Sequence, residues 1–369
     1  MDTMILRWHQ LPEERDQATW AVINVAMALG LQTASSPPGE GREKNDRMVQ
    51  TCIANAQSVL DSLVTRDEDF KGLQTLLGLS VLFMYSPGPK PACVLVAMAV
   101  KLVHRLRAHT REGRERLNDE TTPLQRDRLF WATFILDRDL SVKTMEPYVQ
   151  QDNEYDVEPP SIDIPDDGVG VITSQDGTEK LNLFHYRVQL ALIQGSIHDL
   201  VHSVRARGMP SEKRKAASAR LGLQLWQWRC SIPEAFHYDK LVSWARNSTK
   251  GVPRGLLSMH LTFFLCFFMA HRLHIRDAEW VKNLTEFSDQ FTRERQQRDT
   301  VSNRQDIGAR SPGKREDIIP DHWYNFIEAA RTVVGLVDLI DPADSALLWY
   351  VFSHRSCRSL WHISYVWIK

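Results

Sequence analysis

Two histidines one helical turn apart are the first residues in this chain that could do chemistry. His198 and His202 enclose the sequence HDLVH, and metal ligands on a single helix use this spacing. Zinc proteases, however, carry a glutamate directly after the first histidine, where it acts as the general base. Asp199 stands at that position here, and its shorter side chain would not reach the same water. Because no spacing indicates a third ligand, we predict two ordinary histidines on a helix and no metal site.

Residues typical of covalent or magnesium-dependent catalysis do not form the usual patterns either. No serine lies in a Gly-x-Ser-x-Gly turn, and Cys266 stands inside an apolar aromatic run, where a small core residue is expected. Asp67, Glu68 and Asp69 are consecutive, so on a helix they would point in different directions instead of binding magnesium together. The chain is therefore predicted not to be an enzyme and to hold no cofactor. An all-α enzyme of an unrecognised kind stays open as an alternative.

Composition and charge indicate an ordinary globular protein. Of its 369 residues, 43% are hydrophobic and 25% are charged, and the formal net charge is −1. Such a balance provides no positive field that would hold nucleic acid or an anionic membrane. The five cysteines are scattered too widely for a zinc site or a disulfide framework, which fits a reducing compartment. The apolar run at residues 255–270 is shorter than a membrane span of about 20 residues, so we predict a buried helix and no membrane contact.

The element around which the chain is organised is a helix at residues 125–138, QRDRLFWATFILDR. It is apolar on nearly every side and charged only at its ends, so other helices must surround it. Arg128 and Asp137 lie about two and a half turns apart and cannot pair with each other. Since a charge entering a core is costly without partners, each is expected to bind a neighbouring segment. Trp131 is expected to pack in the core, with an internal cavity that binds a small molecule as the alternative.

Apolar residues that recur every three or four positions predict the other helices. They are expected at residues 17–32, 46–63, 70–85, 94–106, 181–207, 211–230, 255–270, 321–339 and 346–368. Short breaks between the early helices favour antiparallel neighbours, and no series of β-strands is recognisable. The predicted fold class is all-α, a single large domain of about ten helices with long irregular loops.

Two segments lack helical periodicity. Residues 143–179 are rich in proline, glycine and acids, and we predict a long irregular connection that wraps the helical core, with Tyr148, Tyr155 and Val157 as its apolar anchors. Residues 292–318 contain almost no apolar side chains, and their charges are mixed in sign, so a mobile, solvated loop is predicted there.

The ends of the chain complete the predicted organisation. Residues 1–46 are predicted to form an N-terminal helix and a linker rich in proline and glycine, and residues 47–369 the main domain. Because the sequence stops within an apolar run, its C-terminus is expected to be truncated.

An ordered set of motifs resembles the fungal-specific transcription factor domain, which is the middle homology region of zinc binuclear cluster transcription factors. The helix at residues 125–138 shows the family's basic pair, Leu-Phe-Trp, apolar run and Asp-Arg. Residues 97–109 resemble a family helix that ends in Leu-x-x-His, and residues 156–160 resemble its acidic, apolar and proline segment. With residues 327–331 resembling a late family helix, the similarity covers roughly residues 68 to 369.

The resemblance implies that residues 47–369 are the regulatory domain of a fungal transcription factor in the nucleus. Such domains restrain or license transcriptional activation, sometimes by sensing a metabolite. Family members contact DNA through a cysteine-rich zinc module, but no cysteine precedes Cys52 here. DNA contact, and any zinc, is therefore expected only in a missing N-terminal module or through a partner. Other transcription proteins are the expected partners, with a small-molecule effector and a second copy of the chain as further candidates.

The family motif implies a set of site residues that are mainly structural and are candidates for lining an effector pocket. No catalytic, metal-binding or DNA-binding residue is predicted. At the proline turn the family usually has Gly-Arg-Pro where this chain has Met-Glu-Pro, so an anion replaces a cation. A stand-alone helical protein that binds partners or small molecules without DNA stays open as an alternative. The implied site residues are Arg126, Arg128, Phe130, Trp131, Asp137, Arg138 and Pro147.

Overall fold

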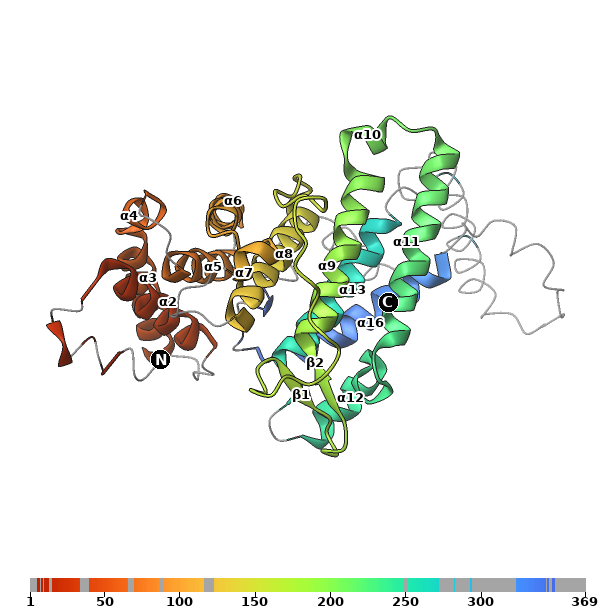
Figure 1. The fold of residues 1–369 in the computed structure, drawn as a ribbon. Coiled ribbons are helices and arrows are strands. Elements are labelled where there is room, and N and C mark those ends of the chain that lie inside the picture. Colours follow the sequence, from red (N-terminus) through yellow and green to blue (C-terminus); the bar gives the residue numbers. More distant parts are fainter. Residues whose placement is uncertain are drawn as a thin grey trace, which may run out of the picture.

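Helices make up most of the described structure. The computed structural model describes residues 5–33, 40–65, 70–115, 123–271 and 323–348, apart from positions 7, 9, 13, 14, 87, 88, 249, 250, 343, 345 and 346, and residues 282 and 293 in addition. Figure 1 shows two groups of helices joined through one helix, α8, in the middle of the molecule. The predicted all-α class is confirmed, because the described strands form only a two-stranded sheet.

The N-terminal group is built around α2, α5 and α6, three helices that are rich in apolar residues. The helix α2 packs against α3 and α5, and α5 packs against α6. A Cβ atom on Gly78 of α5 would lie 2.1 Å from Cγ1 of Val25 on α2, so these two helices touch along their backbones. The group consists of α2 (Gln17–Thr33), α3 (Glu40–Gln57), α4 (Leu60–Thr65), α5 (Phe70–Met84), α6 (Lys90–Arg105) and α7 (Arg111–Glu115).

The C-terminal group surrounds α9 and the apolar helix α13. The helix α9 packs against α8, α11 and α13, and α16 packs against α12 and α13. A π-helical turn at His198–His202 follows α9 directly. The group consists of the hairpin β1 (Val171–Thr173) and β2 (Lys180–Asn182), then α9 (Leu183–Ile197), α10 (Val204–Arg207), α11 (Ser211–Ser231), α12 (Tyr238–Asn247), α13 (Arg254–Ala270) and α16 (Trp323–Val337).

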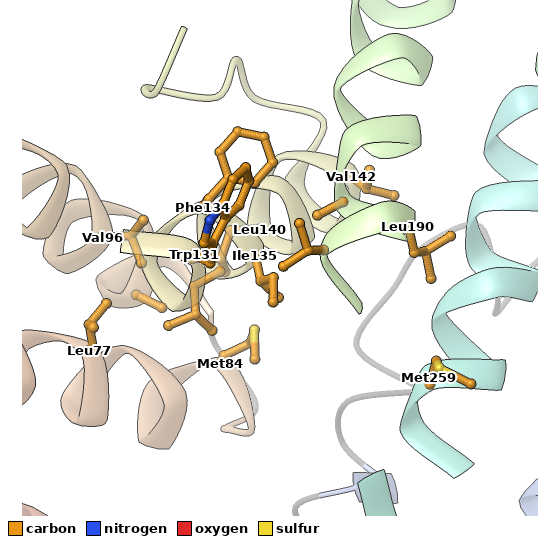
Figure 2. Close-up of a cluster of buried hydrophobic side chains, with 14 of the residues drawn as sticks. Leu77, Met84, Val96, Trp131, Phe134, Ile135, Leu140, Val142, Leu190 and Met259 are labelled. Carbon is orange, nitrogen blue, oxygen red and sulfur yellow. The ribbon is translucent and has the colours of Figure 1, made fainter. Parts of the chain in front are cut away.

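The helix α8 (Pro123–Thr144) is buried between the two groups. It contacts α5 and α6 on one side and α9 on the other. Figure 2 shows the consequence, with Leu77 and Val96 of the first group facing its aromatic part and Leu190 of the second group near its end. The prediction of a helix surrounded by others is confirmed, and both groups share one apolar core.

Several sequence predictions about local structure were incomplete. The helix predicted at residues 181–207 is broken at Ser203, whose extended backbone (ψ 154°) separates the π-helical turn from α10. The predicted connection at residues 143–179 contains the strand β1, and the hairpin turns at Gly177 with a φ of 77°. The short helix α12 was not predicted; it spans 10 residues, of which only Leu241 and Trp244 are buried.

The predicted boundary at residue 46 does not coincide with a break in the described structure. The helix α3 begins at Glu40, and the buried side chains of α2, such as Ala21 and Val25, belong to the same core as the later helices. The division into residues 1–46 and 47–369 nevertheless stays a prediction. The predicted loop at residues 292–318 and most of the helix predicted at 346–368 lie outside the described residues.

The helix α13 confirms the prediction of a buried helix at residues 255–270. Thirteen of its 17 residues are buried, and the burial includes His260, whose ring accepts or donates a hydrogen bond with the Phe236 carbonyl at 2.8 Å. Among the helices that the structure describes, none has the length and apolar content needed to cross a membrane.

The close contact of α2 and α5 gives a stability test. Gly78→Ala should destabilise the protein by about 1–3 kcal/mol, because Val25 is stiff at χ1 and cannot move away from the new methyl group. The matched control is Gly30→Ala on α2, where nothing lies within 4 Å of the added carbon. That change should stabilise the helix by about 0.5–1 kcal/mol. Urea unfolding monitored by circular dichroism measures both, and equal effects would show that α2 does not pack on α5.

Candidate functional site

The polar side chains of α8 hold the connection that follows it. We call residues 145–170, between α8 and β1, the strap, and it runs back along α8 toward the start of that helix. The strap has no helix or strand of its own, so side chains of α8 must satisfy many of its backbone groups. Each of the family-motif residues except Phe130 and Pro147 makes such a polar contact, either to the strap or to the turn after α6.

Asp137 and Arg138 bind the first part of the strap through a single peptide segment. The Asp137 carboxylate accepts the N–H groups of Val149, at 3.0 Å, and of Gln150, at 2.9 Å. Arg138 donates to the Gln150 carbonyl at 2.9 Å and to the Asp152 carboxylate at 2.6 Å. Both the donor and the acceptor of the Gln150 backbone are thus satisfied by neighbouring residues of α8.

The Asp137–Arg138 pair is shielded from water. The side chain of Arg138 is 0% exposed and that of Asp137 is 5% exposed. The guanidinium lies between two rings, 4.3 Å from the centroid of Phe134 and 3.5 Å from that of Tyr148, where cation–π attraction stabilises it. Burial raises the pKa of the Asp137 carboxyl, while the backbone N–H groups of Gln150 and Val149 act in the opposite direction. Hydrogen bonds from the protein, and not water, therefore stabilise the two buried charges.

Trp131 anchors the middle of the strap. Its side chain is buried, and its Nε1–H donates to the Glu158 carbonyl at 3.0 Å. Its ring meets Phe134 and Tyr155 edge to face, at centroid distances of 5.2 and 5.5 Å. Since Tyr155 belongs to the strap and Phe134 to α8, this aromatic cluster fixes the strap by packing as well as by hydrogen bonding. The three predicted anchors are confirmed: Val157 is buried, Tyr155 is half-buried against the core, and the half-buried Tyr148 ring packs on Arg138.

Two arginines near the start of α8 hold more exposed segments. Arg128 forms a two-pronged ion pair with Asp167 near the end of the strap, at 2.5 and 2.9 Å, and its guanidinium lowers the pKa of that carboxyl to about 2. Arg126 is 0% exposed and donates to the carbonyls of Arg107 and Thr110 in the turn after α6. The expectation that Arg128 and Asp137 bind neighbouring segments is confirmed.

A further ionic contact on α8 was missed at the sequence level. Asp139 is 3% exposed and accepts hydrogen bonds from Arg187, at 2.5 Å, and from Gln194, at 2.9 Å. Both partners lie on α9, so this carboxylate fixes the rotation of α9 against α8. A charge placed after a nearly all-apolar helical run is the signal that could have identified it.

Pro147 and Phe130 are the two motif residues that make no polar contact to the strap or to the turn after α6. Pro147 is exposed, in the turn that follows Met145. Met145 has a φ of 60°, in the left-handed region that favours glycine, and glycine is the residue usual here in the resembled family. Met145 therefore adopts a backbone conformation that costs more for methionine than for glycine. Phe130 is buried, 4.9 Å from Trp131 between ring centroids, and has a packing role.

His198 and His202 have different surroundings. His198 is buried against the edge of Tyr148, whereas His202 shares a hydrogen bond with the Met269 carbonyl at 3.2 Å. Burial lowers the pKa of His198. In the part of the chain that the structure describes, no three His, Cys, Asp or Glu residues gather closely enough to hold a metal ion. Cys266 is fully buried in α13, and burial raises the pKa of its thiol, so its predicted place in the core is confirmed.

Comparison with known proteins assigns this helical scaffold to a family. The model of the fungal specific transcription factor domain matches residues 5–292. The chain belongs to this family. The predicted resemblance is confirmed, although the matched region begins earlier than residue 68 and does not extend to the predicted motif at residues 327–331. The matched region therefore includes α2 and α3 together with α8 and the strap.

Curated relatives carry names of transcription factors. An "ABC-transporter-regulating transcription factor" of Aspergillus fumigatus and one of Aspergillus oryzae are each 27% identical over 334 residues, which is 90% of this chain and 34% of those proteins. The "Fusaridione A cluster transcription factor fsdR" of Fusarium heterosporum is 26% identical over 264 residues, 72% of this chain and 48% of that protein. The chain thus spans between a third and a half of the length of these relatives. No solved structure matches it.

Truncation of the central tryptophan should destabilise this family domain strongly. Trp131→Ala is expected to cost about 3–5 kcal/mol, as for other large aromatic residues in cores. Trp226 on α11 is the matched control, since its side chain is 56% exposed. Trp226→Ala should change stability by less than about 0.5 kcal/mol. Chemical unfolding measures both, and a near-neutral Trp131→Ala would mean that the aromatic cluster does not hold the strap.

Asp137→Ala should destabilise the protein by about 3–5 kcal/mol. The change removes the carboxylate that pairs with the buried Arg138 and that accepts the N–H groups of Val149 and Gln150. Asp152→Ala is the comparison within the same network, since the Asp152 side chain is 49% exposed. It should cost less than about 1 kcal/mol. The measurement is the free energy of unfolding of each variant, compared with that of wild type. Equal losses would show that neutralising Arg138, and not binding the strap backbone, is the role of Asp137.

Proposed function

We propose that this chain is a regulatory domain that controls the output of a fungal transcription factor in the nucleus. The observation that carries the proposal is the family match over residues 5–292, which includes α8 and the strap. The names of the relatives support the same role. Nuclear action follows from that role, since transcription is controlled where the genes are.

The geometry favours a domain that acts by binding and not by catalysis. The charged residues of α8 are used in internal contacts: Arg128 binds Asp167, Arg138 binds Asp152 and the Asp137 carboxylate binds strap N–H groups. A catalytic acid or base needs access to a substrate, and these groups are engaged with the protein itself. We infer that the domain has no enzymatic activity and holds no cofactor of its own.

DNA contact is proposed to come from outside this chain. The relatives are two to three times as long as the region they share with it, so a DNA-binding module elsewhere in a longer protein, or a partner transcription protein, would supply the contact. Zinc would belong to that module. A second copy of the chain is a further candidate partner. Since two relatives are named for regulating ABC transporters and align with 90% of this chain, transporter genes are the first targets to test.

Deletion of residues 5–292 from the protein encoded by the native gene should change transcription from a target promoter by about fivefold or more, the coupling expected between a regulatory domain and an activation function. The sign identifies the role: an increase indicates a domain that restrains activation, and a decrease one that licenses it. Reporter activity, normalised to protein amount on immunoblots and to promoter occupancy, is the measurement.

The full-length protein with Trp226→Ala, an exposed change in the same domain, is the control for this experiment. Its reporter activity should equal that of wild type. If the deletion also leaves activity and promoter occupancy at wild-type values, the chain has no regulatory role in this protein.

A further inference from the structure

A pocket beside Trp131 is the strongest unassigned feature of the described structure. It has a volume of about 370 Å³ and lies between the first half of α8 and the second half of the strap, with Phe184 of α9 at its border. This volume lies in the range of small-molecule sites. Three apolar side chains that line the pocket are unusually exposed for their type: Leu124 at 48%, Ile164 at 38% and Val169 at 57%.

The charge around the pocket is negative. Its lining contains four carboxylates but a single guanidinium, that of Arg128, which is already bound by Asp167. Arg111 neutralises one of the four, Glu158. Asp163 contacts only the neutral Ser161 hydroxyl through its side chain, and no residue in the described ranges forms an ion pair with Asp163 or Asp166. The apolar hollow therefore carries acidic groups at its border that a cation can approach.

A second pocket of about 370 Å³ adjoins the first. Arg128, Val169 and Phe184 line both, and Gln74 of α5 borders the second one. Gly170, with a φ of 79°, brings the strap backbone close to Phe184: a Cβ atom there would lie 3.6 Å from the Cβ of Phe184. An apolar body that enters the first pocket can thus extend along Val169 and Phe184 toward α5.

We propose that this pair of pockets binds an amphipathic organic cation: a small molecule with a flat or extended apolar body and an amine or quaternary ammonium group. The apolar body covers Leu124, Val169 and Phe184, and burial of this surface supplies most of the affinity. The cationic group lies toward Asp163 and Asp166, whose carboxylates attract it. An anion of the same shape meets four carboxylates and only one guanidinium, that of Arg128, which Asp167 already binds.

A ligand of this class would be the effector of the proposed regulatory function. The regulatory role of the ligand rests on that proposed function, whereas its binding does not. A bound molecule would contact α8, the strap and α9 together, so its binding energy favours the arrangement in which these elements touch. Binding to the purified chain is measured without any promoter, so failure of the ligand assignment and failure of the regulatory role are distinguishable.

Three fluorescent probes of different charge test the proposal on the full 369-residue chain. Proflavine is a flat cation, N-phenyl-1-naphthylamine is neutral, and 8-anilino-1-naphthalenesulfonate is an anion. Proflavine should bind with a dissociation constant at least about tenfold below that of the anion, at one equivalent per chain. Preference for the anion, equal binding of all three, or no saturable binding of proflavine would overturn the proposal.

A double variant locates the cation. Asp163→Asn with Asp166→Asn should weaken proflavine binding by about three- to tenfold, as expected for loss of two exposed charge contacts, and leave the neutral probe unchanged. The matched control is Glu154→Gln with Glu179→Gln, which removes the same charge at exposed positions that do not line either pocket. Equal effects of the two double variants would overturn the assignment of the site.

A filling variant locates the apolar body. Val169→Trp places a large side chain at the junction of the two pockets and should weaken the cationic and neutral probes together by about tenfold or more. Because Val169 is 57% exposed, the variant should fold, and a thermal melt equal to that of wild type checks this. Undiminished binding to a folded Val169→Trp protein would also overturn the proposal.

Discussion

The structure depends on one constraint, which is that Asp137 and Arg138 are buried together in the second half of α8, a helix with core on both sides. Neither charge could remain there alone, because the cost of removing it from water exceeds what α8 can return by packing. The peptide at Gln150 solves the problem, since its N–H binds the carboxylate and its C=O binds the guanidinium. The strap therefore completes the burial of these charges, although it has no regular secondary structure and only Gln150 and Val157 of it are buried.

The same constraint explains how two groups of helices form one body. The aromatic part of α8 packs on α5 and α6 through apolar side chains. Such contacts hold the helices together but allow small shifts of one helix along another. Asp139 adds direction: its two hydrogen bonds to Arg187 and Gln194 on α9 can form only at one rotation of the two helices. Gly195 supports this arrangement, since a Cβ atom there would lie 2.9 Å from Nε of Arg138. Apolar burial thus supplies most of the stability, and the buried ionic groups determine which packing is adopted.

Periodicity and charge placement predicted the helices and the two-sided burial of α8, and the rule that buried charges need partners predicted that Arg128 and Asp137 would bind neighbouring segments. The identity of those segments could not be predicted. Asp167 is 39 residues from Arg128 in sequence, and nothing in local spacing connects them. The same limit hid the pairing of Arg126 with the turn after α6 and that of Asp139 with α9. Local breaks were missed for another reason: the π-helical turn at His198 keeps a helical pattern of side chains while its hydrogen bonds change.

The two ends of the strap differ in strength, and the difference is set by solvent. At the Gln150 end, the side chains of Arg138 and Asp137 are 0% and 5% exposed, so their hydrogen bonds to the Gln150 backbone are shielded from water. At the other end, Arg128 is 22% exposed and Asp167 is 42% exposed, so salt and water weaken this pair. Between the two ends, the buried Asn182 side chain donates to the carbonyls of Ser161 and Asp163. The part of the strap held mainly by the exposed ion pair is therefore the segment around residues 166–169, beside the pockets. A molecule bound there would act on the solvent-exposed anchor of the strap, while the buried Asp137–Arg138 end keeps the strap in register. A modest binding energy could then shift one segment without unfolding the domain.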